Sequence, residues 1–193
     1  MKWAQSGSFL RNRKEGENME KLKYPVGEFS LEEKPGKAQL QLFIGVIKKL
    51  PEKLSDSVKE LNDEQLDTRY REGGWTIRQV IHHIGDSHAN AYIRFKLALT
   101  EDNPTIRPYF EDRWAELEDY RKVPVEVSLR FISVLHEKWT ILLETMSEED
   151  FKRTYFHPEN NRKYTLAEVT AMYEWHSRHH LAHITSLKER MKW

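Results

Sequence analysis

Hydrophobic residues recur at helical spacing in four long stretches of this chain, at about 36–61, 77–100, 125–146 and 166–191. Apolar residues three or four positions apart share one face of a helix, because a turn of α-helix takes 3.6 residues. Polar and charged residues fill the positions between them, as on a half-exposed helix. The pattern predicts an all-α fold in which four amphipathic helices pack as a four-helix bundle.

Short polar signals mark where these helices begin or end. Thr76 is followed three residues later by Gln79, and Thr165 by Glu168, so each pair can form a capping box. Pro51 falls within the first stretch, and we expect it to end or kink that helix because proline has no N–H to donate. These signals set the starts of the second and fourth long helices.

Two segments between the predicted helices have a different character. Residues 154–158 and 162–164 flank a turn at 159–161, which predicts a short β-hairpin before the last helix. The connection at 103–121 is unusually long and rich in charged and aromatic residues, with one short helix expected near 112–118. Long connections of this kind are often binding loops or lids.

The first 18 residues differ in pattern from the rest of the chain. Residues 1–18 show no helical spacing, so we expect a flexible extension followed by one domain at 19–193. The extension lacks the apolar core of a secretory signal, which predicts a cytoplasmic protein.

The 31 basic and 31 acidic residues balance, so no net charge attracts nucleic acid or a membrane surface. No apolar run approaches the roughly 20 residues of a membrane span.

The chain contains no cysteine. This excludes disulfides, thiolate zinc ligands and a cysteine nucleophile. A metal ion would therefore be bound by histidine, aspartate or glutamate, and any thiol chemistry would need a thiol that a substrate supplies. Histidine is the residue type to follow, because four of the nine histidines fall within eight residues of the last predicted helix.

Two of these four histidines lie in the middle of the apolar face of that helix. His176 and His180 are four residues apart, so their imidazoles are neighbours and can bind one metal ion. The alternative is that both are core histidines hydrogen-bonded to other groups. Two at ligand spacing favour metal binding, whereas His179 projects to the side of the face.

A third ligand must come from another helix. His83 lies on a polar ridge beside the apolar stripe of the second helix and can face the bundle, while we expect its neighbour His82 to point outward. His88 reads as a packed core residue and His136 as a residue at the edge of the third helix. The sequence therefore favours His83, His176 and His180 as three neutral ligands.

The polar ridge that carries His83 also carries Asn90 and Arg94. These two residues can orient a carboxylate or another polar substrate group. The alternative is that the ridge is a solvated helix face.

Several of these segments resemble signatures of the DinB-like superfamily. They are residues 24–28, 73–88, 92–100 and 175–184, and the likeness extends over 19–193. The resemblance implies a four-helix bundle, a homodimer and one divalent ion per subunit, bound by His83, His176 and His180. Members of this type are described as metal-dependent hydrolases or as transferases of the low-molecular-weight thiol bacillithiol.

Three neutral ligands leave a coordination position open, which is the pattern of a catalytic site. We expect Zn²⁺, with Ni²⁺ as the alternative, to activate a water for attack on a small-molecule substrate. The alternatives are a bacillithiol S-transferase that uses the same ion and a non-catalytic metal-dependent binding module. Ser177 stands where a zincin peptidase has its glutamate, which argues against a peptidase. Asp86 or Glu174 can orient a ligand imidazole. The bound ion should stabilise the folded protein, and we expect this stabilisation to be lost near pH 6, where histidines become protonated.

Overall fold

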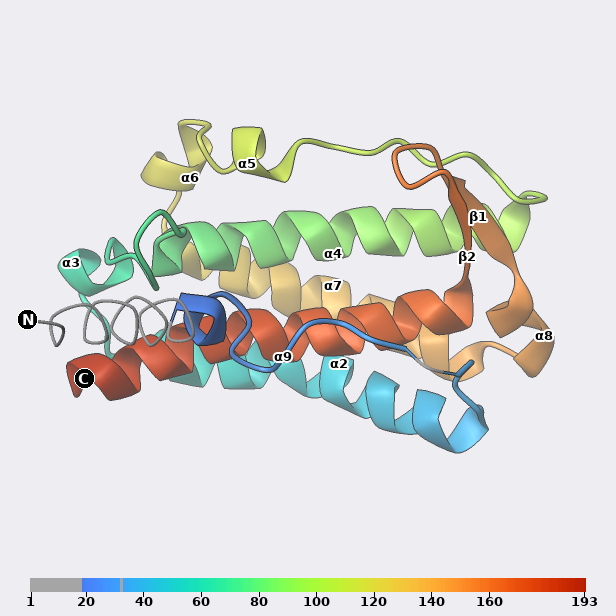
Figure 1. The fold of residues 1–193 in the computed structure, drawn as a ribbon, viewed down its shortest axis with the longest axis horizontal. Coiled ribbons are helices and arrows are strands. Elements are labelled where there is room, and N and C mark those ends of the chain that lie inside the picture. The colour runs from blue at the N-terminus through green and yellow to red at the C-terminus, as the bar shows by residue number, and fades with distance from the viewer. Residues whose placement is uncertain (1–18, 32) are drawn as a thin grey trace, which may run out of the picture.

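The computed structural model describes residues 19–31 and 33–193, and its four long helices form a bundle (Figure 1). The predicted extension at 1–18 lies outside the described residues. The long helices are α2 (Lys37–Val58), α4 (Ile77–Thr100), α7 (Val125–Thr145) and α9 (Leu166–Met191). The predicted all-α four-helix bundle is confirmed.

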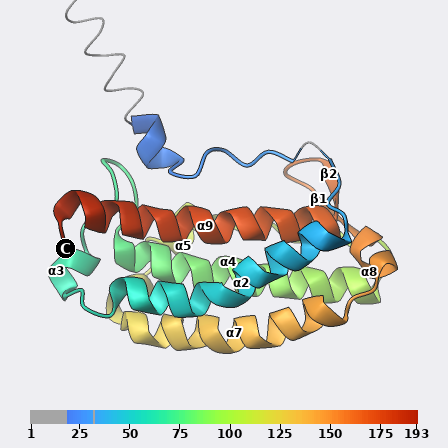
Figure 2. The same ribbon diagram turned by 90° about the horizontal axis from the view of Figure 1, so that it is seen from below.

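The order of the helices around the bundle does not follow the chain. Helices α2 and α4 each pack against both α7 and α9, so α2 and α4 lie diagonally opposite (Figures 1 and 2). Between α2 and α4 the chain forms the short helix α3 (Asp63–Leu66). Between α4 and α7 it returns along the outside of α4 through α5 (Glu111–Trp114) and α6 (Asp119–Lys122), where the sequence indicated one short helix. As a result, α4 and α7 run in the same direction.

The predicted capping boxes are present. The Thr76 hydroxyl accepts a hydrogen bond from the Gln79 amide at 3.1 Å, and the Gln79 side chain accepts one from the Thr76 amide at 3.0 Å. Thr165 and Glu168 pair in the same way at the start of α9. These pairs satisfy amides that the first turn of a helix leaves free. Pro51, in contrast, lies inside α2 and does not end it.

The hairpin forms where it was predicted. After α8 (Glu148–Lys152), strand β1 (Thr154–His157) pairs antiparallel with β2 (Arg162–Thr165), directly before α9. The long connection after α4 is tied to this hairpin, because Phe156 donates to the Pro104 carbonyl at 2.9 Å and accepts from the Ile106 amide at 3.0 Å. The hairpin thus holds one end of the connection beside α4.

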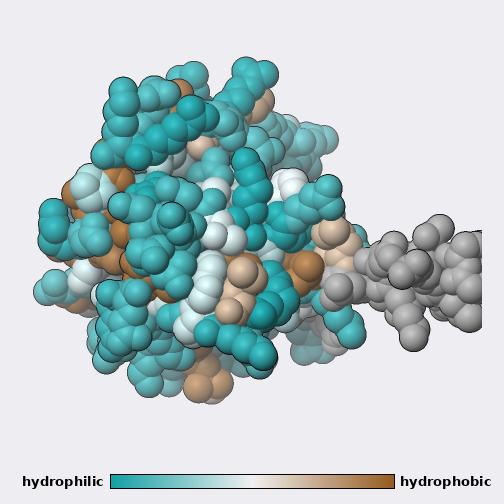
Figure 3. Space-filling view, turned by 90° about the vertical axis from the view of Figure 1, so that its left-hand side faces the viewer, coloured by the Kyte–Doolittle hydropathy of each residue, from teal (hydrophilic) through white to brown (hydrophobic). Residues whose placement is uncertain are grey.

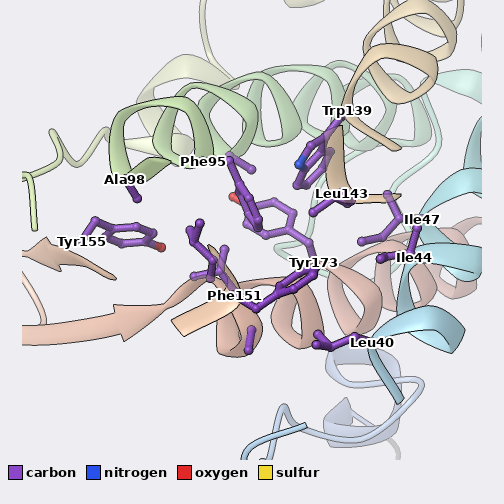
Figure 4. Close-up of a cluster of buried hydrophobic side chains, with 14 of the residues drawn as sticks. Leu40, Ile44, Ile47, Phe95, Ala98, Trp139, Leu143, Phe151, Tyr155 and Tyr173 are labelled. Atoms are coloured by element: carbon purple, nitrogen blue, oxygen red, sulfur yellow. The ribbon is translucent and has the colours of Figure 1, made fainter. Parts of the chain in front are cut away.

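The buried hydrophobic residues form two clusters along the bundle. One lies toward the hairpin and includes Phe95, Trp139 and Tyr173 (Figure 4). The other lies toward α3 and includes Ile81 and Ile184. On α9 the two clusters leave the histidines at 176–183 between them. The polar layer therefore lies between two apolar ones, and the bundle has a core on either side of it.

The surface carries both polar and apolar residues. Figure 3 shows the end of the bundle with α3 and the C-terminus, where hydrophilic residues cover most of the face. No helix in the described part of the chain is long and apolar enough to cross a membrane. The outer side of α7 carries an exposed apolar stripe, namely Val127, Phe131, Val134 and Ile141.

Candidate metal centre

Three imidazoles from two helices meet inside the bundle. His83 of α4 faces His176 and His180 of α9, and the candidate ligand nitrogens of the three rings all lie within 4.8 Å of one another. The Nε2 atoms of His83 and His176 are 3.3 Å apart. Two nitrogens bound to a tetrahedral zinc ion at about 2.0–2.1 Å are separated by about 3.3 Å. The separation of these two nitrogens therefore fits one divalent ion between them.

The three rings are neutral near pH 7 because the protein buries them. Burial lowers the pKa of His83 to about 3, with the charge of nearby His179 acting in the same direction. Burial, followed by the charges of neighbouring histidines, holds the pKa values of His176 and His180 well below 6.5. A neutral imidazole keeps the lone pair that a metal ion requires. The donor set therefore suits Zn²⁺ or a similar ion.

The environment of His180 supports the same interpretation. Among the described residues, neither ring nitrogen of His180 has a hydrogen-bond partner, although its Nδ1 atom is fully buried. The Trp75 ring packs beside both His83 and His180, with centroid separations of 4.5 and 6.2 Å. A buried polar atom without a partner is destabilising. The Nε2 atom of His180 likewise has no partner among the described residues, so its lone pair is free to bind an ion.

A second group of histidines adjoins the first on α9. His179, His180 and His183 also bring ring nitrogens within 4.8 Å, but this group shares His180 with the first. His183 already contacts the Lys23 carbonyl at 3.1 Å through Nε2, and Trp175 stacks on His179 at 4.4 Å. His179 is buried, with 7% of its surface exposed. The group that joins two helices is therefore the better candidate for the metal ligands.

The remaining histidines on α4 and α7 are also buried. His82 was expected to point outward, but it is 5% exposed and lies 2.7 Å from the Ser128 hydroxyl of α7. This prediction was wrong because α7 runs alongside α4 and covers that side of the helix. His88 is fully buried, as expected, and His136 is buried in the bundle although an edge position was expected.

His88 and His136 connect the candidate ligand His176 to α2. The His176 Nδ1 atom lies 3.0 Å from His88 Nε2, and His88 Nδ1 lies 2.8 Å from His136 Nε2. The His136 Nδ1 atom donates to the Ile47 carbonyl at 2.8 Å. The sequence indicated that His88 would be hydrogen-bonded, but it could not show this chain of contacts because its members lie on four helices.

A cavity of about 430 Å³ opens above the three histidines. Ser87 and Arg94 of α4 line it, so part of the polar ridge forms a cavity wall and is not a solvated face. The connection after α4 and the hairpin also contribute, through Tyr109 and His157. The connection therefore forms part of the cavity wall, in keeping with the binding loop that its length and aromatic content suggested.

The two substrate-binding candidates occupy different environments. Arg94 lines the cavity and is 8% exposed, and it donates to the Arg107 carbonyl at 3.3 Å. No acidic side chain in the described ranges lies within 4.0 Å of a guanidinium nitrogen of Arg94. Asn90 is not among the residues that line the cavity, and its amide donates to the Asp86 carbonyl at 2.9 Å.

The two acids considered as partners of the ligand imidazoles bind other groups. Asp86 accepts a hydrogen bond from the Tyr120 hydroxyl at 2.7 Å. Glu174 pairs with Arg178 one turn along α9, with a nitrogen–oxygen distance of 2.5 Å. In the described part of the chain, the partner of a ligand imidazole is another histidine, His88.

Comparison with known proteins finds a matching family and relatives that are named for metal dependence. Residues 47–184 match the DinB superfamily. The chain is 48% identical to YfiT of Bacillus subtilis over 172 aligned residues. The aligned region covers 89% of this chain and 97% of YfiT. It is 50% identical over 175 residues to a Bacillus cereus protein, covering 91% of this chain and all of that protein. Both relatives are named as candidate metal-dependent hydrolases.

Solved structures give the same fold. The structure of Bacillus subtilis YfiT, described as an unusual four-helix-bundle topology, superposes with a TM-score of 0.87 over 90% of this chain and 99% of YfiT. A mycothiol-dependent maleylpyruvate isomerase is 14% identical, with a TM-score of 0.58 over 77% of this chain and 60% of the isomerase. The second likeness concerns the fold alone.

Proposed function

This chain belongs to the DinB superfamily, and from that membership and its histidine cluster we propose that it is a metal-dependent hydrolase of small molecules. The observation that carries the proposal is the position of His83, His176 and His180 at the base of a cavity. Three protein ligands with a cavity beside them are typical of catalytic sites, whereas structural zinc sites have four protein ligands.

We propose His83, His176 and His180 as the ligands, with Zn²⁺ preferred and Ni²⁺ as the alternative. When bound, the divalent ion lowers the pKa of a coordinated water toward about 7 and polarises a substrate oxygen. The chain's own residues fix the geometry: α4 and α9 hold the rings, and Trp75 packs against two of them. The connection after α4 and the hairpin form further walls of the cavity.

Arg94 indicates the charge of the substrate. A buried guanidinium with no carboxylate within 4.0 Å is costly unless an anion binds it; the acidic residues that line the same cavity are Glu111 and Glu159. Arg94 follows His83 by eleven residues, or roughly 16 Å along the helix axis, and helix side chains lean toward the N-terminus. We therefore propose a substrate whose carboxylate or other anionic group lies on the order of 10 Å from its reactive carbon. Asn90, with its amide bonded within α4, stays a weaker candidate.

The test compares metal-loaded protein with chelator-treated protein on paired esters and amides that differ only in one carboxylate. The expected result is metal-dependent hydrolysis that His176→Ala abolishes, with Arg94→Gln slowing only the carboxylate-bearing member of each pair. Arg94→Lys is the matched control that keeps the charge. Turnover only when a low-molecular-weight thiol and an electrophile are added would replace this proposal with the S-transferase. Tight metal binding without any turnover would favour a binding module.

The apolar stripe on α7 supports a homodimer. Val127, Phe131, Val134 and Ile141 lie on one side of the helix and are between 42% and 65% exposed. A row of exposed apolar side chains along one helix is typical of an interaction site. We propose that two copies pack through this stripe. Light scattering of Val134→Glu should then show monomers where the unmodified protein forms dimers, and an unchanged mass would exclude the stripe as the interface.

A further inference from the structure

The chain of hydrogen bonds behind His176 has a fixed direction, and the carbonyl of Ile47 sets it. A carbonyl oxygen only accepts hydrogen bonds. The His136 Nδ1 atom, 2.8 Å away, must therefore carry a proton. In a neutral imidazole the other nitrogen is then an acceptor, so His136 Nε2 accepts from His88 Nδ1 at 2.8 Å.

The same reasoning continues to the candidate metal ligand. His88 has its proton on Nδ1, so its Nε2 atom is an acceptor and takes the hydrogen bond from His176 Nδ1 at 3.0 Å. That leaves the His176 Nε2 atom with a free lone pair, and this atom faces His83 Nε2 at 3.3 Å. The protons in the chain thus place the lone pair of His176 where a metal ion would bind.

The Ile47 carbonyl is available for this role because of a proline. In a regular helix it would accept from the N–H of the residue four positions later. That residue is Pro51, which lies inside α2 and has no N–H. Ile47 is fully buried, so its carbonyl needs a partner from another helix, and His136 provides it. Pro51 therefore directs a carbonyl of α2 toward α7.

We propose that His88 and His136 are positioning residues of the metal centre, which hold His176 in the tautomer with its proton on Nδ1. The proposal rests on the proposed metal site. Neither residue would touch the ion or the substrate. The rings stay neutral because both are buried: the pKa of His136 is lowered to about 4 and that of His88 lies well below 6.5. Hydrogen-bonded partners of this kind typically raise metal affinity by about 10- to 100-fold.

The first experiment reads the tautomers directly. The full chain is labelled with ¹⁵N at histidine, stripped of metal with a chelator and studied by long-range ¹H–¹⁵N NMR near pH 7.5, about one unit above the ordinary histidine pKa. Signals are assigned by their loss in single histidine variants. The expected result is a proton on Nδ1 in His136, His88 and His176. A proton on Nε2 of His176 with Nδ1 free would overturn the proposal.

The second experiment measures Zn²⁺ affinity by competition with a chromophoric chelator. His136→Leu removes both the donor and the acceptor. We expect its dissociation constant for Zn²⁺ to be 10- to 100-fold higher, with mixed tautomers at His176. His136→Gln keeps an amide donor for Ile47 and an oxygen that accepts from His88, so it should lose less than tenfold. The matched control is His82→Gln, which replaces a buried histidine of α4 that takes no part in the hydrogen bonds from Ile47 to His176. This variant should bind Zn²⁺ with the affinity of the unmodified protein.

The outcomes separate a positioning role from a structural one. If His136 only fills space, His136→Leu lowers the melting temperature while the folded protein binds Zn²⁺ with unchanged affinity, and the proposal fails. If His136→Leu does not fold, the tautomers of the unmodified protein still decide. If the tautomers are as expected but His176→Ala binds Zn²⁺ as the unmodified protein does, the proposed metal site fails and the hydrogen-bond chain stands.

Discussion

A divalent ion should stabilise this protein by an amount that persists below pH 6. The perturbation is addition of Zn²⁺ to chelator-treated protein. An ion that binds the folded state alone adds about 4 kcal/mol to the free energy of unfolding at a thousandfold excess over its dissociation constant. For a domain of this size that gain raises the melting temperature by roughly 8–16 °C. The metal-free protein should remain folded, because apolar clusters flank the histidine layer on both sides.

Burial changes the pH range that ordinary histidines would predict. With the ordinary pKa of 6.5, protons would displace the ion near pH 6. The folded protein lowers the pKa of His83 to about 3 and those of His176 and His180 well below 6.5. His83 therefore stays neutral at pH 5.5, and His176 and His180 titrate at lower pH than free histidines do, so the gain from Zn²⁺ should persist below pH 6.

Total stability should nevertheless fall in acid. Below pH 6.5 the unfolded chain binds protons that the folded state excludes, so the free energy of unfolding decreases as pH falls toward the folded pKa values. For His83, whose folded pKa is about 3, the loss at pH 5.5 is about 1.4 kcal/mol. Other buried histidines add to it, because burial also lowers the pKa values of His136 and His88.

The assay is thermal or urea unfolding with and without Zn²⁺ between about pH 5.5 and 8, which brackets the ordinary histidine titration. Both curves should fall below pH 6.5 while the difference between them holds. A difference that disappears between pH 6.5 and 6 would show that the ligands titrate normally and are not buried together. Coincident curves at pH 8 would show that His83, His176 and His180 do not form the site.

Three further predictions concern the scaffold. Removing residues 1–18 should change the melting temperature by no more than a few degrees, because that segment has no helical spacing; a larger fall in a thermal scan would show that it packs. Leu54→Ala in the core of α2 should cost about 2–5 kcal/mol in urea unfolding, while Leu42→Ala, 70% exposed on the same helix, should cost almost nothing. Thr165→Ala should cost about 1 kcal/mol through loss of the α9 cap, and an unchanged stability would mean that the cap contributes nothing.

Local features of this fold could be read from the sequence. Helical spacing and the capping boxes at Thr76 and Thr165 depend on residues three or four positions apart, so the starts of α4 and α9 were predictable. The pairing of His176 with His180 is local in the same way. The third histidine needed a position on another helix, and the polar ridge of α4 indicated it.

Features that depend on how the helices pair could not be read in this way. The diagonal placement of α2 and α4 is a tertiary choice, and it determines that α7 covers His82. The same choice brings His136 to the Ile47 carbonyl. Pro51 was visible four residues after Ile47, but its consequence appeared only when the donor from α7 was known. Hydrogen bonds between helices therefore supplied what spacing within a helix does not contain.

Metal analysis of the purified protein after dialysis tests the central claim most directly. We expect about one equivalent of divalent ion per chain, because the three ligands form one site. His83→Ala, His176→Ala and His180→Ala should each lose tight binding, while His179→Ala, a buried histidine next to the site, should retain most of it. A full equivalent with unchanged affinity in any of the three ligand variants would contradict the assigned site.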